Sequence, residues 1–285
     1  GTFCHEFGHV MGLPDYYDTR SGTNYSNRMT PRHWSIMDLG NYLNEGKTPP
    51  NYSAYDKYFF GWETPVNLGT AEQSVTLIPV GKEGCVTYQV TASGRAAAAT
   101  STETVYYLEN RQKQGWDAYL SHGLLIWKVQ YNESAWRTNV PNNTAYAPRY
   151  TLVSATGSTT GLGTSQDPFP GKLGITEVSL MSNRNLTDIE EKDSLVYFLF
   201  NRAPKTYTLT ATSMFSLNDR IQSGEAYYSI QVTCQDTAGH TFPVHIHINT
   251  SAYAGNFSTN AFQLDSTYLI INGVKTTPTA RSEER

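Results

Sequence analysis

The 285-residue sequence is short of charge, of cysteine and of long apolar runs. Charged residues make up 16% of the chain, and the net charge of -4 offers no basic excess that would favour nucleic-acid binding. Three cysteines, Cys4, Cys85 and Cys234, allow at most one disulfide bond and exclude a disulfide framework. No run of about 20 apolar residues occurs, so we expect no membrane span.

Aromatic and small polar residues are abundant instead. Hydrophobic residues make up 39% of the chain, and 20 Tyr and 11 Phe provide material for a folded core. Low charge combined with many Thr, Ser, Asn and Tyr is typical of extracellular β-rich proteins. We therefore expect a folded protein that acts outside the cell or at its surface.

The first residues carry a metal-binding pattern. His5 and His9 are four residues apart with Glu6 beside the first, so on a helix both imidazoles share one face and Glu6 lies one residue round from it. Gly12 can end the helix in a left-handed turn, and Pro14 prevents the helix from resuming. The chain can then bring Asp15 back as a third ligand, which is the number that a catalytic zinc usually takes from the protein.

The run from His5 to Asp18, HEFGHVMGLPDYYD, resembles the zinc site of the immune inhibitor A family of bacterial secreted metallopeptidases, and it fits the broader metzincin pattern. The resemblance implies a zinc endopeptidase that hydrolyses protein or peptide substrates. His5, His9 and Asp15 would bind Zn²⁺, and Glu6 would be the general base toward a zinc-activated water. In the family, the N-terminal half of the catalytic domain precedes this helix. We expect that half to be absent here, which leaves open whether this chain alone is active.

Three weaker signals surround the motif. Met37, in the run WSIMDLG, resembles the Met-turn that lies beneath the zinc ligands of metzincins, where a soft side chain packs under the imidazoles. A calcium ion is a further expectation, with Asp15, Asp18 and Asn24 as oxygen ligands, and a solvated turn is the alternative. Cys4 is either an extra ligand or a small buried residue of the helix.

The rest of the chain favours an α+β fold. Ser53 is a candidate N-cap for a helix within residues 48–62, and β-rich runs follow from residue 75 onward. The block 106–129 resembles the same family, and its Glu109 and Arg111 are interpreted either as shaping the substrate side or as an ion pair that is buried or at the rim. We expect residues 1–203 to be the C-terminal part of a zincin-type catalytic domain with a β-rich extension.

A boundary is expected near Pro204, where strand signals follow one another to the end of the chain. Residues 204–285 are predicted to form a small β-sandwich accessory domain. His245 and His247 alternate on one of its strands, and they are either metal ligands or simply one outer face.

Two other functions remain open at this point. The chain could be a β-rich binding or adhesion module that carries an incomplete, inactive zinc site, or another metallohydrolase such as an amidase. The presence of Glu6 together with all three candidate ligands argues against the inactive module, and the Met37 turn and the block 106–129 favour the peptidase over another metallohydrolase. The sequence indicates neither the cleavage preference nor the oligomeric state.

Overall fold

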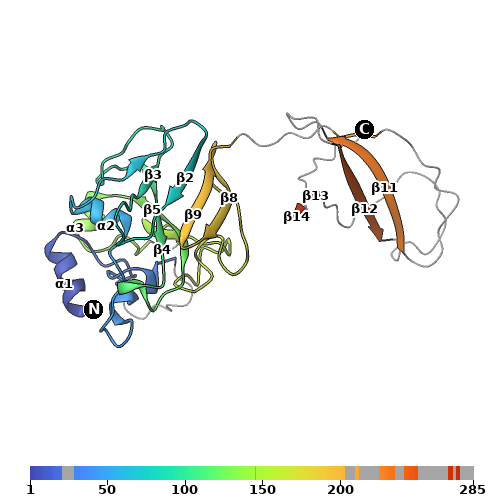
Figure 1. The fold of residues 1–285 in the computed structure, drawn as a ribbon. Helices are drawn as coiled ribbons and strands as arrows, with labels where there is room; N and C mark the ends of the chain where they lie inside the picture. The colour runs from blue at the N-terminus through green and yellow to red at the C-terminus, as the bar shows by residue number, and fades with distance from the viewer. Residues whose placement is uncertain are drawn as a thin grey trace. The chain divides into compact units, whose positions relative to one another are not determined.

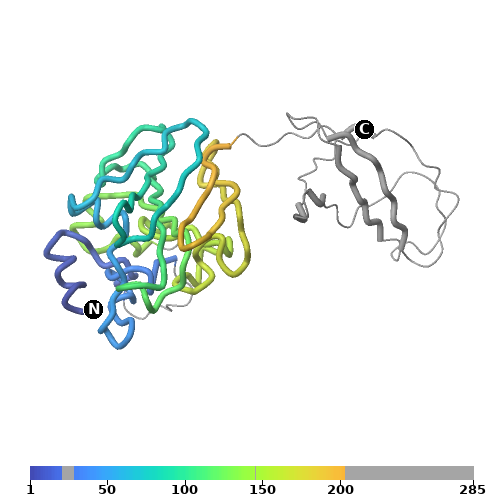
Figure 2. Tube along the Cα trace, in the orientation of Figure 1, coloured from blue at the N-terminus to red at the C-terminus, as the bar shows by residue number. Residues whose placement is uncertain are grey.

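The computed structural model describes residues 1–20, 29–144 and 146–202 with their side chains, and beyond them the backbone of strands β10 to β14. The chain divides into two compact units, Gly1–Ala203 and Pro204–Arg285 (Figure 1). Helices and sheets are both present, so the α+β prediction is confirmed. Figure 2 follows the first unit from the N-terminal helix to strand β9.

A five-stranded sheet forms the centre of the first unit, with the strand order β1-β3-β4-β5-β6. β1 and β3 pair in parallel, and the remaining neighbours are antiparallel. The strands are β1 Val66–Asn67, β3 Tyr88–Val90, β4 Thr104–Arg111, β5 Gly123–Gln130 and β6 Tyr150–Val153. Long stretches of β4 and β5 are continuously buried, which is the pattern of strands covered on both faces.

An antiparallel sheet in the order β2-β9-β8-β7 covers one face of this centre. Its strands are β2 Gln73–Leu77, β7 Val178–Met181, β8 Arg184–Lys192 and β9 Leu195–Phe200. Leu108 on β4 and Leu124 and Ile126 on β5 pack in one cluster with Phe198 and Phe200 of β9. Alternate side chains of the central strands thus fill the space between the two sheets.

The other face of the central sheet packs against the helical N-terminal part. Tyr107, Leu125 and Trp127 belong to a second cluster, which also contains Met37 and Tyr55. The helices are α1 Thr2–Val10, α2 Ala54–Phe59 and α3 Glu133–Arg137, with 3₁₀ turns η2 Arg32–Trp34, η3 Leu39–Tyr42 and η4 Gly115–Asp117. The aromatic core on this face of the sheet therefore supports the N-terminal part, which carries the candidate metal-binding residues.

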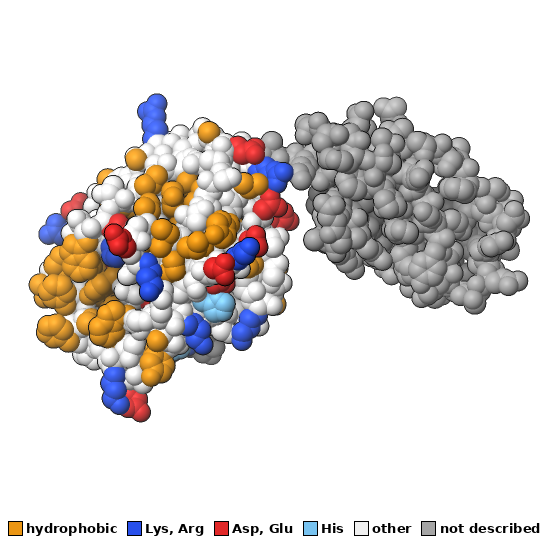
Figure 3. Space-filling view, in the orientation of Figure 1, with side chains coloured by type: hydrophobic (Ala, Val, Ile, Leu, Met, Phe, Trp, Pro, Cys, Tyr) orange, Lys and Arg blue, Asp and Glu red, His pale blue; other side chains and the backbone are white. Residues whose placement is uncertain are grey.

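α1 buries His5 and Gly8 and leaves its opposite face open. Phe3, Phe7 and Val10 are exposed, and hydrophobic side chains gather on the surface over this helix (Figure 3). None of the helices in the described part of the chain has the length and apolar character of a membrane span.

α2 begins with the capping residue that the sequence indicated. Ser53 Oγ accepts a hydrogen bond from Asp56 N–H, and Asp56 accepts one in return from Ser53 N–H, which completes a capping box. The helix is shorter than the predicted range because Gly61, with φ of 75°, ends it. α3 has only five residues, too few for a periodic pattern, and was not predicted.

In the second unit the described backbone forms two antiparallel groups, β10-β11-β12 and β13-β14. The strands are β10 Leu209–Ala211, β11 Glu225–Cys234, β12 Thr241–Asn249, β13 Leu269–Ile271 and β14 Val274–Thr276. His245 and His247 lie on β12, and their side chains fall outside the described part of the structure. A β-sandwich for this unit remains a prediction.

Candidate metal centre

The C-terminus of α1 folds back through the turn that the sequence predicted. Gly12 has φ of 98°, a left-handed conformation that glycine adopts without strain. The N–H of Gly12 donates to the His9 carbonyl at 2.9 Å and the N–H of Leu13 to the Gly8 carbonyl at 3.0 Å. These two bonds form a Schellman motif, which closes the helix and redirects the chain.

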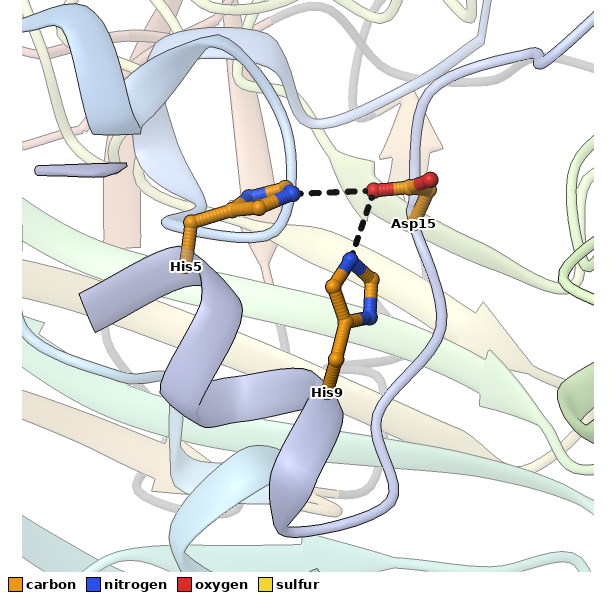
Figure 4. A group of neighbouring side chains, drawn as sticks. All are labelled: His5, His9 and Asp15. Atoms are coloured by element: carbon orange, nitrogen blue, oxygen red, sulfur yellow. Dashed lines mark ion pairs between the residues drawn. The ribbon is translucent and has the colours of Figure 1, made fainter. Parts of the chain in front are cut away.

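The turn brings Asp15 to the two histidines. Asp15 Oδ1 lies 3.0 Å from His5 Nε2 and 3.3 Å from His9 Nε2 (Figure 4). The three candidate ligand atoms all lie within 4.8 Å of one another. Among the residues that the structure describes, these side chains form the only such group of His, Cys, Asp or Glu.

Backbone carbonyls orient both imidazole rings. His5 Nδ1 lies 2.9 Å from the Ile36 carbonyl oxygen, and His9 Nδ1 lies 2.8 Å from the Leu13 carbonyl oxygen. Because a carbonyl oxygen only accepts hydrogen bonds, each Nδ1 is assigned the proton of the ring. The Nε2 atom of each neutral imidazole then presents a lone pair, and both Nε2 atoms face Asp15 (Figure 4).

The third member of the group is also an acceptor. Asp15 Oδ1 is buried and accepts no hydrogen bond, although two histidine nitrogens lie next to it. Three lone pairs therefore converge, which is unfavourable unless a cation lies between them. A tetrahedral zinc site with bonds of about 2.0–2.2 Å separates its ligand atoms by roughly 3.3–3.5 Å. The donor set fits zinc, and the distances of 3.0 and 3.3 Å from Asp15 Oδ1 to the two histidine nitrogens lie near this separation.

The pKa values of the group reflect the same geometry. Burial alone would lower the pKa of His5, but Asp15 and the Ile36 carbonyl outweigh burial and hold this pKa above its ordinary value. Burial alone would raise the pKa of Asp15, but the neighbouring His5 ring, together with Asn139 and Tyr17, holds it below its ordinary value. The site therefore favours a positive charge between the carboxylate and the rings.

Access to the group is one-sided. The side chains of His5 and Asp15 are 8% exposed, whereas that of His9 is 31% exposed, so the group opens to solvent beside His9. Glu6 is exposed on α1, one residue along from His5. Three protein ligands with an open side are the arrangement of a catalytic rather than a structural zinc site.

Met37 lies under α1. It is fully buried, and a Cβ atom built on Gly8 would lie 2.4 Å from Met37 Sδ, so the sulfur packs against the helix backbone between the two histidines. The Met37 carbonyl accepts a hydrogen bond of 2.8 Å from Tyr16 N–H. The segment around Met37 thus supports both the helix and the loop that carries Asp15.

The calcium expectation finds no support. Asp15 points into the histidine group, and Asp18 holds the Arg20 side chain through contacts of 2.9 and 2.6 Å. Asn24 lies outside the described residues. Cys4 is partly buried against the core and is not a member of the metal group.

The idea that Glu109 and Arg111 shape the substrate side is wrong, and the alternative of a buried ion pair is confirmed. Both side chains are fully buried, and Arg111 Nε lies 2.9 Å from Glu109 Oε1. Asp117 completes the group at 2.8 Å from Arg111 Nη1. These residues belong to the interior of the fold because no part of either Glu109 or Arg111 reaches the surface.

Sequence reasoning missed the groups that orient the ligands. The carbonyls of Leu13 and Ile36 carry no signal because every residue has a carbonyl. Asn139, which contacts Asp15, follows α3 and precedes Pro141, a pattern typical of a helix end. That pattern predicts a turn at Asn139 but gives no indication of a contact with a residue 124 positions away.

Comparison with known proteins agrees with the motif. Residues 1–67 match the family described as immune inhibitor A peptidase M6, catalytic domain. Immune inhibitor A of Bacillus thuringiensis subsp. alesti is 40% identical over 63 residues, which is 21% of this chain and 9% of that protein. The pre-pro-metalloprotease PrtV of Vibrio cholerae serotype O1 (strain M66-2) is 39% identical over 62 residues, 21% of this chain and 6% of that protein.

The matched stretch of the chain covers less than a tenth of the length of these curated relatives. The matched stretch nevertheless contains α1, the turn at Gly12, Asp15 and Met37. The resemblance inferred from the motif is therefore confirmed over residues 1–67, which are similar to the catalytic domain of the immune inhibitor A peptidase M6 family.

Proposed function

We propose that this chain carries the zinc site of a metalloendopeptidase, with His5, His9 and Asp15 as the metal ligands. One observation carries the proposal. Two oriented imidazole nitrogens and one buried carboxylate oxygen converge without a hydrogen-bond donor among them. The similarity of residues 1–67 to a peptidase catalytic domain supports the reaction class.

When bound, a zinc ion supplies a Lewis acid that polarises a peptide carbonyl and acidifies a water molecule. The chain's own residues supply the proton transfers. Glu6, exposed next to His5, takes the proton of the attacking water on its carboxylate and delivers it to the nitrogen of the leaving amine. His5 and His9 keep their protons on Nδ1 throughout because the Ile36 and Leu13 carbonyls hold those atoms.

Several finer assignments belong to the same proposal. The first unit is the C-terminal part of a zincin-type domain, and Met37 is its Met-turn residue, packed under Gly8. The protein acts outside the cell on protein or peptide substrates. The second unit is a β-sandwich accessory domain. The resemblance of residues 1–67 to the family supports the zincin-type and Met-turn assignments, and the low charge of the chain supports the extracellular location. The antiparallel strands of the second unit support the β-sandwich.

The test measures metal content and hydrolysis separately. The 285-residue chain, Glu6→Gln and His9→Ala are purified, and bound zinc is measured by elemental mass spectrometry. Hydrolysis of a mixture of fluorogenic peptides is measured on the same samples. We expect one zinc ion per chain in the wild type and in Glu6→Gln and none in His9→Ala, because Glu6 is a base and His9 a ligand.

Peptide hydrolysis separates the two leading functions. Hydrolysis by the wild type that is lost in Glu6→Gln supports the peptidase. Zinc binding without hydrolysis by the wild type would instead favour the binding module with an inactive site. Equal zinc content in the wild type and His9→Ala would rule out the assigned ligands.

A further inference from the structure

Asn139 holds Asp15 by two hydrogen bonds. Its Nδ2 donates to Asp15 Oδ2 at 2.7 Å, and its Oδ1 accepts from the Asp15 backbone N–H at 2.6 Å. One amide side chain therefore fixes both the backbone and the carboxylate of Asp15. Asn139 binds Oδ2 of the carboxylate, and the other oxygen, Oδ1, lies next to the two histidine nitrogens.

The backbone of Asn139 is itself fixed by the end of α3. Asn139 has φ of 60°, and its N–H donates to the Trp136 carbonyl at 3.3 Å. The N–H of Val140 donates to the Ala135 carbonyl at 2.9 Å, so Asn139 occupies the left-handed position of a Schellman motif. Trp136 and Ala135 are buried in the core, so the helix end is anchored to the same cluster that supports Met37.

Two neighbouring asparagines hold the rest of the loop after Asp15. Asn142 Nδ2 donates to the Tyr16 carbonyl at 2.7 Å. Asn143 accepts from Thr19 N–H at 2.9 Å and donates to Thr19 Oγ1 at 2.8 Å. Of the three asparagines, only Asn139 bonds to the carboxylate of a candidate ligand.

We propose that Asn139 is a positioning residue for the metal site, acting through Asp15. The proposal rests on the function proposed above, because it assigns a role toward the same ligand set. Asn139 holds the Asp15 carboxylate in the orientation in which Oδ1 completes the group, so that little conformational freedom remains to be lost when a metal binds. Groups that orient a ligand in this way typically contribute about 10- to 100-fold to metal affinity.

The test compares Asn139→Gly with Asn143→Ala in the full chain. Glycine suits the left-handed position at the end of α3, so Asn139→Gly removes both hydrogen bonds to Asp15 while keeping the backbone conformation. Asn143→Ala removes two hydrogen bonds to the same loop but none to Asp15. The dissociation constant for Zn²⁺ is measured by competition with a chromophoric chelator, and thermal unfolding is measured in EDTA.

We expect Asn139→Gly to bind Zn²⁺ about 10- to 100-fold more weakly than the wild type. Asn143→Ala should stay within about twofold of the wild type if, as we propose, the effect runs through the Asp15 carboxylate. A double variant that combines Asn139→Gly with Asp15→Ala tests whether Asn139 acts through Asp15. If Asn139 acts through Asp15, the additional change caused by Asn139→Gly disappears in the Asp15→Ala background.

The outcomes separate this proposal from the one on which it rests. A wild-type chain that binds no Zn²⁺ would overturn the metal site and the role of Asn139 together. Tight binding by the wild type with an equal dissociation constant in Asn139→Gly would overturn the positioning role alone. Equal weakening in Asn139→Gly and Asn143→Ala would also overturn it, because the effect would then come from loosening the loop.

Discussion

Met37 Sδ packs against Gly8, the residue of α1 that lies between the two histidines and has no side chain. A Cβ atom at position 8 would approach the sulfur to 2.4 Å, so glycine is required for this close contact. The helix that carries the candidate ligands therefore rests directly on the segment that also provides the Ile36 carbonyl for His5.

Shortening Met37 should destabilise the fold. Met37→Ala removes a fully buried side chain and leaves a cavity under α1, so we expect the free energy of unfolding to fall by about 2–5 kcal/mol. Met37→Leu keeps most of the volume and should lower it by less than about 1.5 kcal/mol. Urea denaturation of the metal-free chain measures both variants. Equal losses in the two variants would mean that volume is not what Met37 contributes.

Gly12 and Gly61 provide a matched pair for the turn after α1. Both follow a helix, both have positive φ, of 98° and 75°, and both are exposed. Alanine at either position should lower the free energy of unfolding by about 1–2 kcal/mol because of the left-handed backbone. Only Gly12→Ala should also weaken Zn²⁺ binding, since the turn at Gly12 positions Leu13 and Asp15. Chelator competition on both variants checks this, and similar affinities would contradict it.

Removing the charge of Arg111 should be far more damaging than removing a surface charge. Arg111→Met leaves Glu109 and Asp117 buried without their partner, so we expect the free energy of unfolding to fall by about 3–5 kcal/mol. Arg137 pairs with Glu133 on the exposed surface of α3, and Arg137→Met should change it by less than about 0.5 kcal/mol. A loss in Arg111→Met no larger than that in Arg137→Met would show that the buried ion pair is dispensable.

Asp56 should make stability depend on pH. Burial raises its pKa to about 6 from an ordinary value of 3.8, despite hydrogen bonds from Ser53 and Tyr16. Between these two values the folded chain binds more protons than the unfolded chain, so the contribution of Asp56 to the free energy of unfolding falls as pH rises. The total fall in the free energy of unfolding is about 3 kcal/mol, and it is complete once the pH exceeds the pKa of Asp56 in the folded chain.

Asp56→Asn removes this titration. Relative to the wild type, the variant should gain free energy of unfolding as the pH is raised from about 4 to above 6, whatever its constant loss from altered hydrogen bonding. Urea denaturation across this range measures the difference at each pH. A constant difference between the two proteins would show that Asp56 has an ordinary pKa in the folded chain.

The local sequence determined the elements that depend on neighbouring residues. The helix with His5 and His9 on one face, the left-handed turn at Gly12 and the cap at Ser53 follow from spacing and backbone preference within a few residues. The β-rich runs followed from residue type, and β4 and β5 overlap the two ends of the block 106–129. These features can be predicted from the sequence because the residues that form them are only a few positions apart.

Only the tertiary structure decided which atoms of the ligands face one another. The proton on His5 Nδ1 depends on a carbonyl 31 residues away, and the orientation of Asp15 depends on an asparagine 124 residues away. The burial of Arg111 likewise follows from a sheet covered on both faces, which no single strand reveals. The sequence therefore predicts which residue types are the candidate ligands. Their geometry arises from long-range packing and hydrogen bonds, which a local sequence pattern cannot encode.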